Sequence, residues 1–345
     1  MGAYILRRLL LMIPTLFGVL LVCFVIVQFV PGGPVQRIIG QLTGQGGNAL
    51  DRIGGGGADF GQSHESLGLG TANSKYRGAQ GLDPAFIASL EKQFGLDKPP
   101  LERFRILVWN YLRFDFGNSY FRDISVVQLI KEKLPVSISL GLWMTLISYA
   151  ISIPLGIKAA TARGKWADQA IRILSLVGLS FPNFWLALML VLLFAITLKW
   201  LPPSGMNGFE SFIMPAVTMG IILTATNVRL VRTAMLETLN SQYIMVARAK
   251  GLSENVVLYK HALRNCAIPL ITYFGLQFGG LLGGIVVVER VFNWPGLGTL
   301  AFDAVGARDY PVLQAVITVL SLMIIGVNLL VDIAYGLVDP RIRTE

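Results

Sequence analysis

Long apolar blocks separated by polar segments dominate the hydrophobic pattern of this chain. Six stretches reach the roughly 20 apolar residues that an α-helix needs to cross a bilayer. Some contain Pro or Gly, which membrane helices tolerate when neighbouring helices satisfy the freed backbone groups. The pattern therefore predicts an all-α membrane protein with six transmembrane helices, at residues 9–30, 136–157, 172–198, 211–231, 266–288 and 312–338.

The first apolar stretch follows Arg7 and Arg8, so a secretory signal peptide is an alternative interpretation. The apolar run covers residues 9–30, however, whereas the apolar region of a signal peptide has roughly 7–15 residues. No small-x-small cleavage site follows the run. We therefore expect residues 1–30 to be an uncleaved first transmembrane helix.

Basic residues in the short loops predict the orientation of the chain. Segments 158–172 and 229–265 carry an excess of Lys and Arg over acidic residues, whereas 199–210 and 289–311 carry few basic residues. Cytoplasmic loops of membrane proteins are enriched in Lys and Arg. We therefore expect the two basic segments, the N-terminus and the C-terminal PRIRTE to lie in the cytoplasm.

The same orientation places the long segment 31–135 outside, because long loops are translocated whatever their charge. Its Gly-rich part, residues 40–80, is expected to be either a disordered insert or an arm that reaches a partner. Asp83 and Pro84 predict a helix start, with Asp as N-cap and Pro in the first turn. A second amphipathic stretch, LERFRILVWNYLRF, fits a helix on the membrane surface or a docking surface equally well. Residues 136–345 then form a five-helix transmembrane core.

Composition agrees with a membrane protein. Of the 345 residues, 54% are hydrophobic and only 14% are charged, against roughly 25% charged in soluble domains. The positive-inside rule accounts for the net charge of +9, so we expect no nucleic-acid partner. The two Cys and two His residues offer neither a disulfide framework nor a zinc site, and we expect no metal.

One polar segment, residues 236–265, interrupts the apolar pattern between two predicted spans. Apolar and small residues recur near helical spacing over 236–250, and Gly251 is placed to end that helix. Ser253 is a suitable N-cap for a short second helix, with Glu254 at its positive end. On the residues alone this segment is either a compact cytoplasmic knob that docks a partner or an ordinary basic loop.

The sequence ARAKGLSENVVLYKHALRN within this segment resembles the coupling segment of permease subunits of binding-protein-dependent ABC importers, in the dipeptide/oligopeptide branch. The general family pattern is Glu-Ala-Ala, three residues, Gly, nine residues, then Ile-x-Leu-Pro. Here Ala247, Gly251 and Leu263 match it. The chain departs from the general pattern at Met245, Val246, His261 and Arg264. The peptide branch, with ARAKGL and HALRN, is matched more closely.

Further segments resemble the same branch, including FGLDKPPLERF, DFGNSYF, LPVSISLGL, SFPNFWLALML, LPPSG, VFNWPGLGTLAFDAVGARDYPVLQA and NLLVDIAYGLVDPRIR. The Gly-rich insert 40–80 resembles the sub-branch of oligopeptide importers that also takes up microcin C. Together these matches cover most of the chain from Gly95 onward and its RRLL-PTLFGV start.

The resemblance implies a type I ABC importer permease fold in a bacterial inner membrane, with peptide as cargo. It also implies a paralogous permease partner, two ATPase subunits that bind ATP and Mg²⁺, and a periplasmic peptide-binding protein. This chain lacks a P-loop, since its only Gly-Lys pair, Gly164-Lys165, is followed by Trp166. The implied ATPase-coupling residues are Ala247, Arg248, Ala249, Lys250, Gly251, Leu252, Ser253, His261, Leu263, Arg264 and Asn265.

Polar side chains inside predicted spans are candidates for the translocation path, because they are costly in lipid. They are Asn183, Asn227, Asn328 and Asp332. For Asp332, pairing with a basic residue at the inner face of the bundle is the favoured alternative. The competing functions are a proton-driven peptide carrier, an intramembrane protease and a purely structural subunit. The sequence contains no GxSxG, no HExxH and no paired intramembrane aspartates, which an intramembrane protease would need. A proton-driven carrier would need more acidic residues within the spans than this chain has.

Overall fold

The computed structural model describes residues 2–29, 34–35, 38–39, 83–93, 96–122, 124–206 and 208–338. These residues are nearly all helical; apart from helices and turns they contain one isolated bridge, between Asn118 and Ser125. The Gly-rich insert 40–80 and the C-terminal PRIRTE lie outside the described residues.

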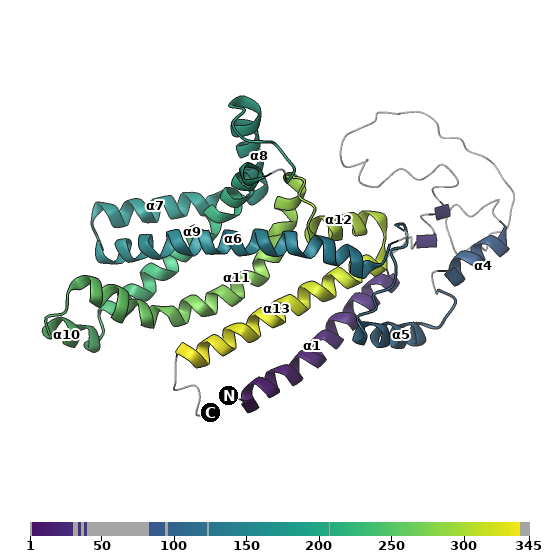
Figure 1. The fold of residues 1–345 in the computed structure, drawn as a ribbon, viewed down its shortest axis with the longest axis horizontal. Coiled ribbons are helices and arrows are strands. Elements are labelled where there is room, and N and C mark those ends of the chain that lie inside the picture. The colour runs from purple at the N-terminus through teal and green to yellow at the C-terminus, as the bar shows by residue number, and fades with distance from the viewer. Residues whose placement is uncertain are drawn as a thin grey trace. The chain divides into compact units, whose positions relative to one another are not determined.

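Each of the six predicted spans coincides with a helix or a pair of helices (Figure 1). Within the part of the chain described, four helices are long and apolar enough to cross a membrane, or five if one bent pair is counted. The stretch 266–288 lies inside a continuous helix of 29 residues. The single helices are α1 (Gly2–Phe29), α6 (Val126–Thr161), α9 (Phe209–Leu239), α11 (Leu263–Val291) and α13 (Tyr310–Val338).

The third span is not one straight helix over 172–198. Helix α7 (Trp166–Ser180) ends before Pro182, and the chain continues as α8 (Asn183–Leu190) and the π-helical η1 (Val191–Thr197) after a bend of 95°. Proline disfavours helical geometry in the residue before it and has no N–H to donate. Phe181 accordingly has φ −94° and ψ 127°, which is extended backbone.

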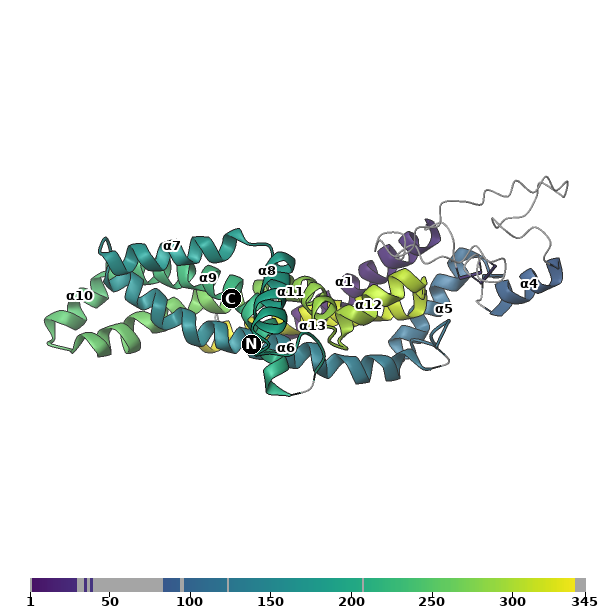
Figure 2. The same ribbon diagram turned by 90° about the horizontal axis from the view of Figure 1, so that it is seen from above.

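The chain forms two compact units, the first of which holds residues 1–12, 132–299 and 320–345. In this unit α9 packs against α7 on one side and α11 on the other, and α8 contacts both α9 and α11. One apolar core gathers around Met144, Met214 and Phe292, and another around Val231, Met235 and Ile244. Figure 2 shows the same unit from above, with α7 alongside α9.

Helices α6 and α9 approach closely at Gly156. A Cβ atom at this position would lie 2.5 Å from Cβ of Val231, so only glycine fits without a shift of the helices. About two turns earlier in α6, Ser148 accepts a hydrogen bond from Nδ2 of Asn227 (3.1 Å), and both side chains are fully buried. Small residues and hydrogen bonds are the usual means by which helices associate in lipid.

The second unit holds residues 13–131 and 300–319. Its helices include α4 (Pro84–Gln93) and α5 (Pro100–Leu112), as the sequence predicts. The carboxylate of Asp83 accepts the N–H of Ala85 at 2.9 Å, which confirms the predicted N-cap. A buried carboxylate, Asp309, accepts hydrogen bonds from the Ser119 hydroxyl and from the Tyr120 N–H, and so links α13 to the loop that precedes α6.

Candidate functional site

The segment 236–265 forms a turn and two helical pieces at the end of the first unit farthest from α8 (Figure 1). Helix α9 ends at Leu239, and α10 (Gln242–Ala249) begins after Ser241. The prediction of a single helix over 236–250 is therefore wrong. The break at Asn240 and Ser241 allows α10 to leave the axis of α9, because Ser241 has the extended backbone of an N-cap (ψ 151°).

Gly251 ends α10 as predicted. Its φ is +77°, a left-handed conformation that costs glycine little, and its N–H donates to the carbonyl of Arg248 at 2.9 Å. An ion pair of 2.8 Å between Nε of Arg248 and Oε1 of Glu254 spans the turn. No atom lies within 4 Å of a Cβ built on Gly251, so the turn faces open space.

The second half of the segment differs from its prediction. The carbonyl of Ser253 accepts the N–H of Val257 (3.0 Å), so Ser253 starts a helix. That helix is not short: it passes through η2 (Val256–Ala262), a π-helical stretch, and continues without a break into α11. Asn265, which directly precedes the predicted span 266–288, lies inside this continuous helix and donates to the hydroxyl of Tyr243 on α10.

The segment is packed firmly against the membrane helices that flank it. Ile244 and Ala247 of α10 and Val257 of η2 are buried together with Val231 and Met235 of α9. Because close-packed interiors transmit displacement rather than absorb it, movement of α10 is passed to α9 and α11. A rigid link of this kind is what a force-transmitting element requires.

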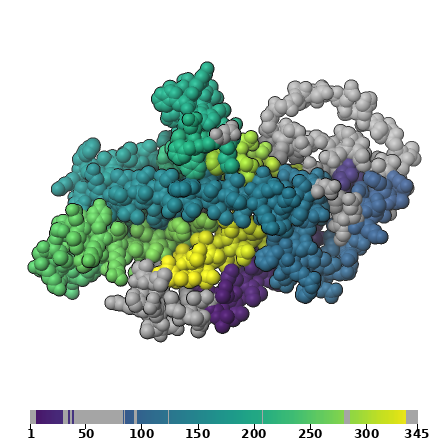
Figure 3. All heavy atoms as spheres, viewed as in Figure 1, coloured from purple at the N-terminus to yellow at the C-terminus, as the bar shows by residue number. Residues whose placement is uncertain are grey.

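The outward face of the segment combines apolar and basic side chains. Met245 and Val246 are 57% and 52% exposed. Among the predicted coupling residues, Ala247 is buried, His261 and Leu263 are half-buried, and the others are exposed: Arg248, Ala249, Lys250, Gly251, Leu252, Ser253, Arg264 and Asn265. The segment projects at the green end of the first unit in Figure 3. An exposed apolar patch with a polar rim is typical of a protein-binding surface.

A groove of about 500 Å³ lies between this segment and the end of α6. Its lining includes the charged side chains of Arg163, Arg248 and Glu254. The apolar part of the lining is formed by Leu236, Leu239 and Leu258. The groove thus lies between the end of α6 and the residues on either side of the turn at Gly251, Arg248 and Glu254.

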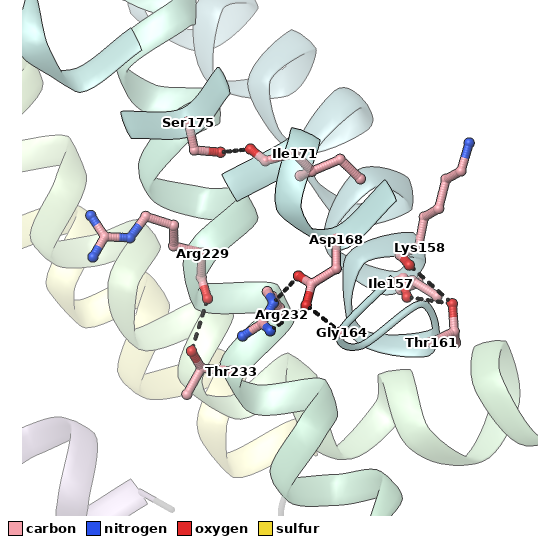
Figure 4. Close-up of polar contacts among 10 residues, drawn as sticks. All are labelled: Ile157, Lys158, Thr161, Gly164, Asp168, Ile171, Ser175, Arg229, Arg232 and Thr233. Atoms are coloured by element: carbon pink, nitrogen blue, oxygen red, sulfur yellow. Dashed lines mark hydrogen bonds and ion pairs between the residues drawn. The ribbon is translucent and has the colours of Figure 1, made fainter. Parts of the chain in front are cut away.

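A buried ion pair at the same end was missed by sequence reasoning. Asp168 of α7 is 1% exposed and accepts two hydrogen bonds from Arg232 of α9, at 2.6 and 2.8 Å (Figure 4). The N–H of Gly164 donates to the same carboxylate at 3.0 Å. In the sequence, Asp168 is the single acid of the basic segment 158–172. Its position in the first turn of a helix, just after a glycine turn, was the available signal.

The four polar candidates for a translocation path lie on three helices, and no described contact joins one to another. Nδ2 of Asn183 lies 3.3 Å from Sδ of Met219, and Asn328 is exposed on α13. Asp332 forms an ion pair with Arg8 of α1, with Nε 3.1 Å from Oδ2. Pairing with a basic residue, the favoured alternative for Asp332, is what the structure shows.

Comparison with known proteins identifies the family. The model of the binding-protein-dependent transport system inner membrane component matches residues 152–344, more than half of the chain. The chain belongs to this family of ABC importer permeases. The predicted importer fold is thereby confirmed, and the chain is a subunit whose family members leave ATP hydrolysis to other subunits.

Relatives at 36–45% identity span the whole chain. The peptidoglycan transport system permease protein YejB of Agrobacterium fabrum is 45% identical over 363 residues, covering 100% of this chain and 99% of that protein. The inner membrane ABC transporter permease protein YejB of Escherichia coli O157:H7 is 39% identical, with 100% of both covered. The glutathione transport system permease protein GsiC of Escherichia coli K12 is 36% identical, covering 99% of this permease and 98% of that protein.

Solved structures agree on the fold. The inward-facing MetNI methionine ABC transporter contains a chain that matches this permease with a TM-score of 0.52 at 16% identity. The match covers 62% of this permease and 97% of that chain. The shared part is therefore a complete type I permease core, to which this permease adds further residues.

Proposed function

We propose that this permease imports peptides across the inner membrane, with ATP and Mg²⁺ bound on separate ATPase subunits. The observation that carries the proposal is the full-length similarity to permeases named for peptidoglycan and glutathione transport. Both compounds contain peptide bonds. The chain also lacks a P-loop: its one Gly-Lys pair forms a turn whose Gly164 N–H is used by Asp168.

The packing of segment 236–265 supports a coupling role. ATP binding closes the ATPase pair, and the exposed face of α10 moves with the ATPase surface that holds it. Because Ile244, Ala247 and Val257 are buried against α9, this movement tilts α9 and α11. The cavity then opens outward to receive peptide, and hydrolysis returns it to the inward-facing state.

The assembly proposed here has this permease paired with a paralogous permease, two ATPase subunits inside and a peptide-binding protein outside. Both termini of the chain lie in the cytoplasm. The resemblance of residues 40–80 to the microcin C sub-branch adds antibiotic peptides to the proposed cargo. The proposed translocation path includes Asn183, Asn227 and Asn328, whereas Asp332 is assigned to the ion pair with Arg8.

ATP hydrolysis by the material that co-purifies with this chain tests the proposal. We expect mild extraction of the tagged chain to retain ATPase subunits, with activity that rises when periplasmic extract is added. Any binding protein captured in this way carries bound cargo that mass spectrometry can identify. A chain that purifies alone in every mild detergent, without ATPase activity, would contradict the proposal and favour a proton-driven carrier.

A further inference from the structure

The outward face of helix α5 is apolar where a water-exposed helix would be polar. Leu101, Arg105, Trp109 and Leu112 follow one another at spacings of four, four and three residues, so they share one face of the helix. Leu101, Trp109 and Leu112 are 82%, 56% and 69% exposed. An amphipathic helix normally turns its polar face to solvent. Something apolar must therefore cover this face in the membrane.

Helix α5 lies against the second half of the first transmembrane helix. The Phe104 ring contacts the rings of Phe17 and Phe24 of α1, with centroids 5.5 and 5.3 Å apart. Arg103 donates to the amide oxygen of Gln28 at 2.7 Å. Since Gln28 lies at the end of the apolar run of α1, α5 is held at the level where a span meets the lipid headgroups.

The exposed surface of α1 continues the apolar face of α5. From Ile13 onward in α1, several residues are 40–63% exposed: Ile13, Phe17, Leu21, Val22, Val25 and Ile26. A transmembrane helix with this much exposed apolar surface faces lipid or another membrane helix. The apolar face of α5 therefore adjoins a surface that is already suited to acyl chains.

A groove of about 990 Å³ with a mostly apolar lining runs along α5, and α1 contributes Phe17 to it. Phe17 and Phe104 form part of its wall, and Arg105 brings a positive charge into it. The lining also includes Glu102, whose negative charge is paired with Lys98 at 3.7 Å. Arg113 adds a second positive charge, stacked over Trp109 at 4.5 Å from the ring centroid. Tryptophan and arginine beside an apolar groove are typical of the membrane interface.

We propose that α5 and the second half of α1 form a binding site for an anionic phospholipid. An acyl chain occupies the groove beside Phe17 and Phe104, and the phosphate lies near the guanidinium groups of Arg105 and Arg113. The positive charges select an anionic over a zwitterionic headgroup. The bound lipid covers the exposed side chains of α5 and stabilises its position against α1.

Quenching of Trp109 by brominated lipids tests the site. The full chain, purified with its accompanying subunits, is placed in phosphatidylcholine vesicles with a minor fraction of brominated phosphatidylglycerol or brominated phosphatidylcholine. The difference between wild type and Trp109→Phe isolates the emission of Trp109. We expect clearly stronger quenching by the anionic lipid, because its relative affinity for the site rises roughly fivefold for each arginine that contacts it. The variant carrying both Arg105→Gln and Arg113→Gln should lose this preference.

Trp143→Phe is the matched control, because Trp143 is 55% exposed in the apolar run of α6 and should be quenched alike by both lipids. Two results would overturn the site. Absence of quenching of Trp109 by either lipid would show that protein or water covers the face of α5. Equal quenching by the two lipids would show contact with bulk lipid without a selective headgroup site.

Discussion

At the scale of single residues, the permease places a full ion pair in its interior beside the loop between α6 and α7. Asp168 is almost fully buried, and the Arg232 side chain is 19% exposed. Ionised groups lose hydration energy on burial, so such a pair persists only when both partners are well hydrogen-bonded. Asp168 meets this condition, because it accepts two hydrogen bonds from the Arg232 guanidinium and one from the Gly164 N–H.

We expect Asp168→Ala to lower stability by about 3 kcal/mol or more, because it leaves the Arg232 charge buried without a partner. The measurement is the midpoint of thermal unfolding in detergent. Glu254→Ala is the control, since it breaks the exposed pair with Arg248, and such pairs contribute roughly 0–1 kcal/mol. Equal shifts of the midpoint in the two variants would contradict a structural role for the buried pair.

At the scale of elements, the approach of α6 to α9 depends on the absence of one side chain. We expect Gly156→Ala to destabilise the protein by about 1–3 kcal/mol, because the new Cβ would overlap with Val231. Gly220→Ala on α9 is the matched control: no atom lies within 4 Å of its Cβ, and alanine favours helix. Equal unfolding temperatures for the two variants would show that α6 and α9 leave room for a side chain at position 156, and would contradict the prediction.

The turn between α10 and η2 carries the second prediction at this scale. Gly251→Asp should leave membrane insertion intact, because the turn faces open space and Asp tolerates a left-handed backbone better than most residues. We expect peptide uptake to fall severely, since the new carboxylate lies on the proposed ATPase-binding surface. Uptake of a labelled peptide and the amount of permease in the membrane are the measurements.

Gly164→Asn and Gly251→Asn form a matched pair for this experiment. Both glycines have φ +77° and open space at Cβ, so the backbone strain is the same. Only the variant at 251 should lose uptake. Loss in both variants would indicate that strain at this end of the protein, rather than docking at Gly251, reduces transport.

At the scale of the whole molecule, the source of energy separates an importer from a carrier. We expect depletion of ATP to abolish peptide uptake, and an uncoupler to leave uptake unchanged while ATP is maintained. The physical reason is that two acids of the described transmembrane helices are held by partners: buried Glu289 of α11 accepts hydrogen bonds from Ser137 and Thr299, and Asp332 is paired with Arg8. Uptake that collapses with the uncoupler alone would favour the carrier.

Sequence patterns predicted the elements well and their junctions less well. The positions of α4, α5 and α6 follow from apolar runs and from Asp83 and Pro84, which act locally. The bend at Phe181, the break at Ser241 and the continuity of η2 with α11 were not predicted. The bend at Phe181 has a local cause in Pro182, but many membrane helices tolerate proline, so its presence alone did not predict a bend. The other two features depend on how a helix packs against its neighbours, and the periodicity of one helix does not contain that information.

By itself the sequence determined that the permease is helical and membrane-spanning, and that Gly251 ends a helix, because bilayer thickness and backbone sterics act on neighbouring residues. Only the tertiary structure decided which side chains meet. Asp168 and Arg232 are 64 residues apart, and Arg8 and Asp332 are 324 apart. Contacts between residues so far apart in the sequence arise from helix packing. These two ion pairs could therefore be identified only from the positions of α7, α9, α1 and α13.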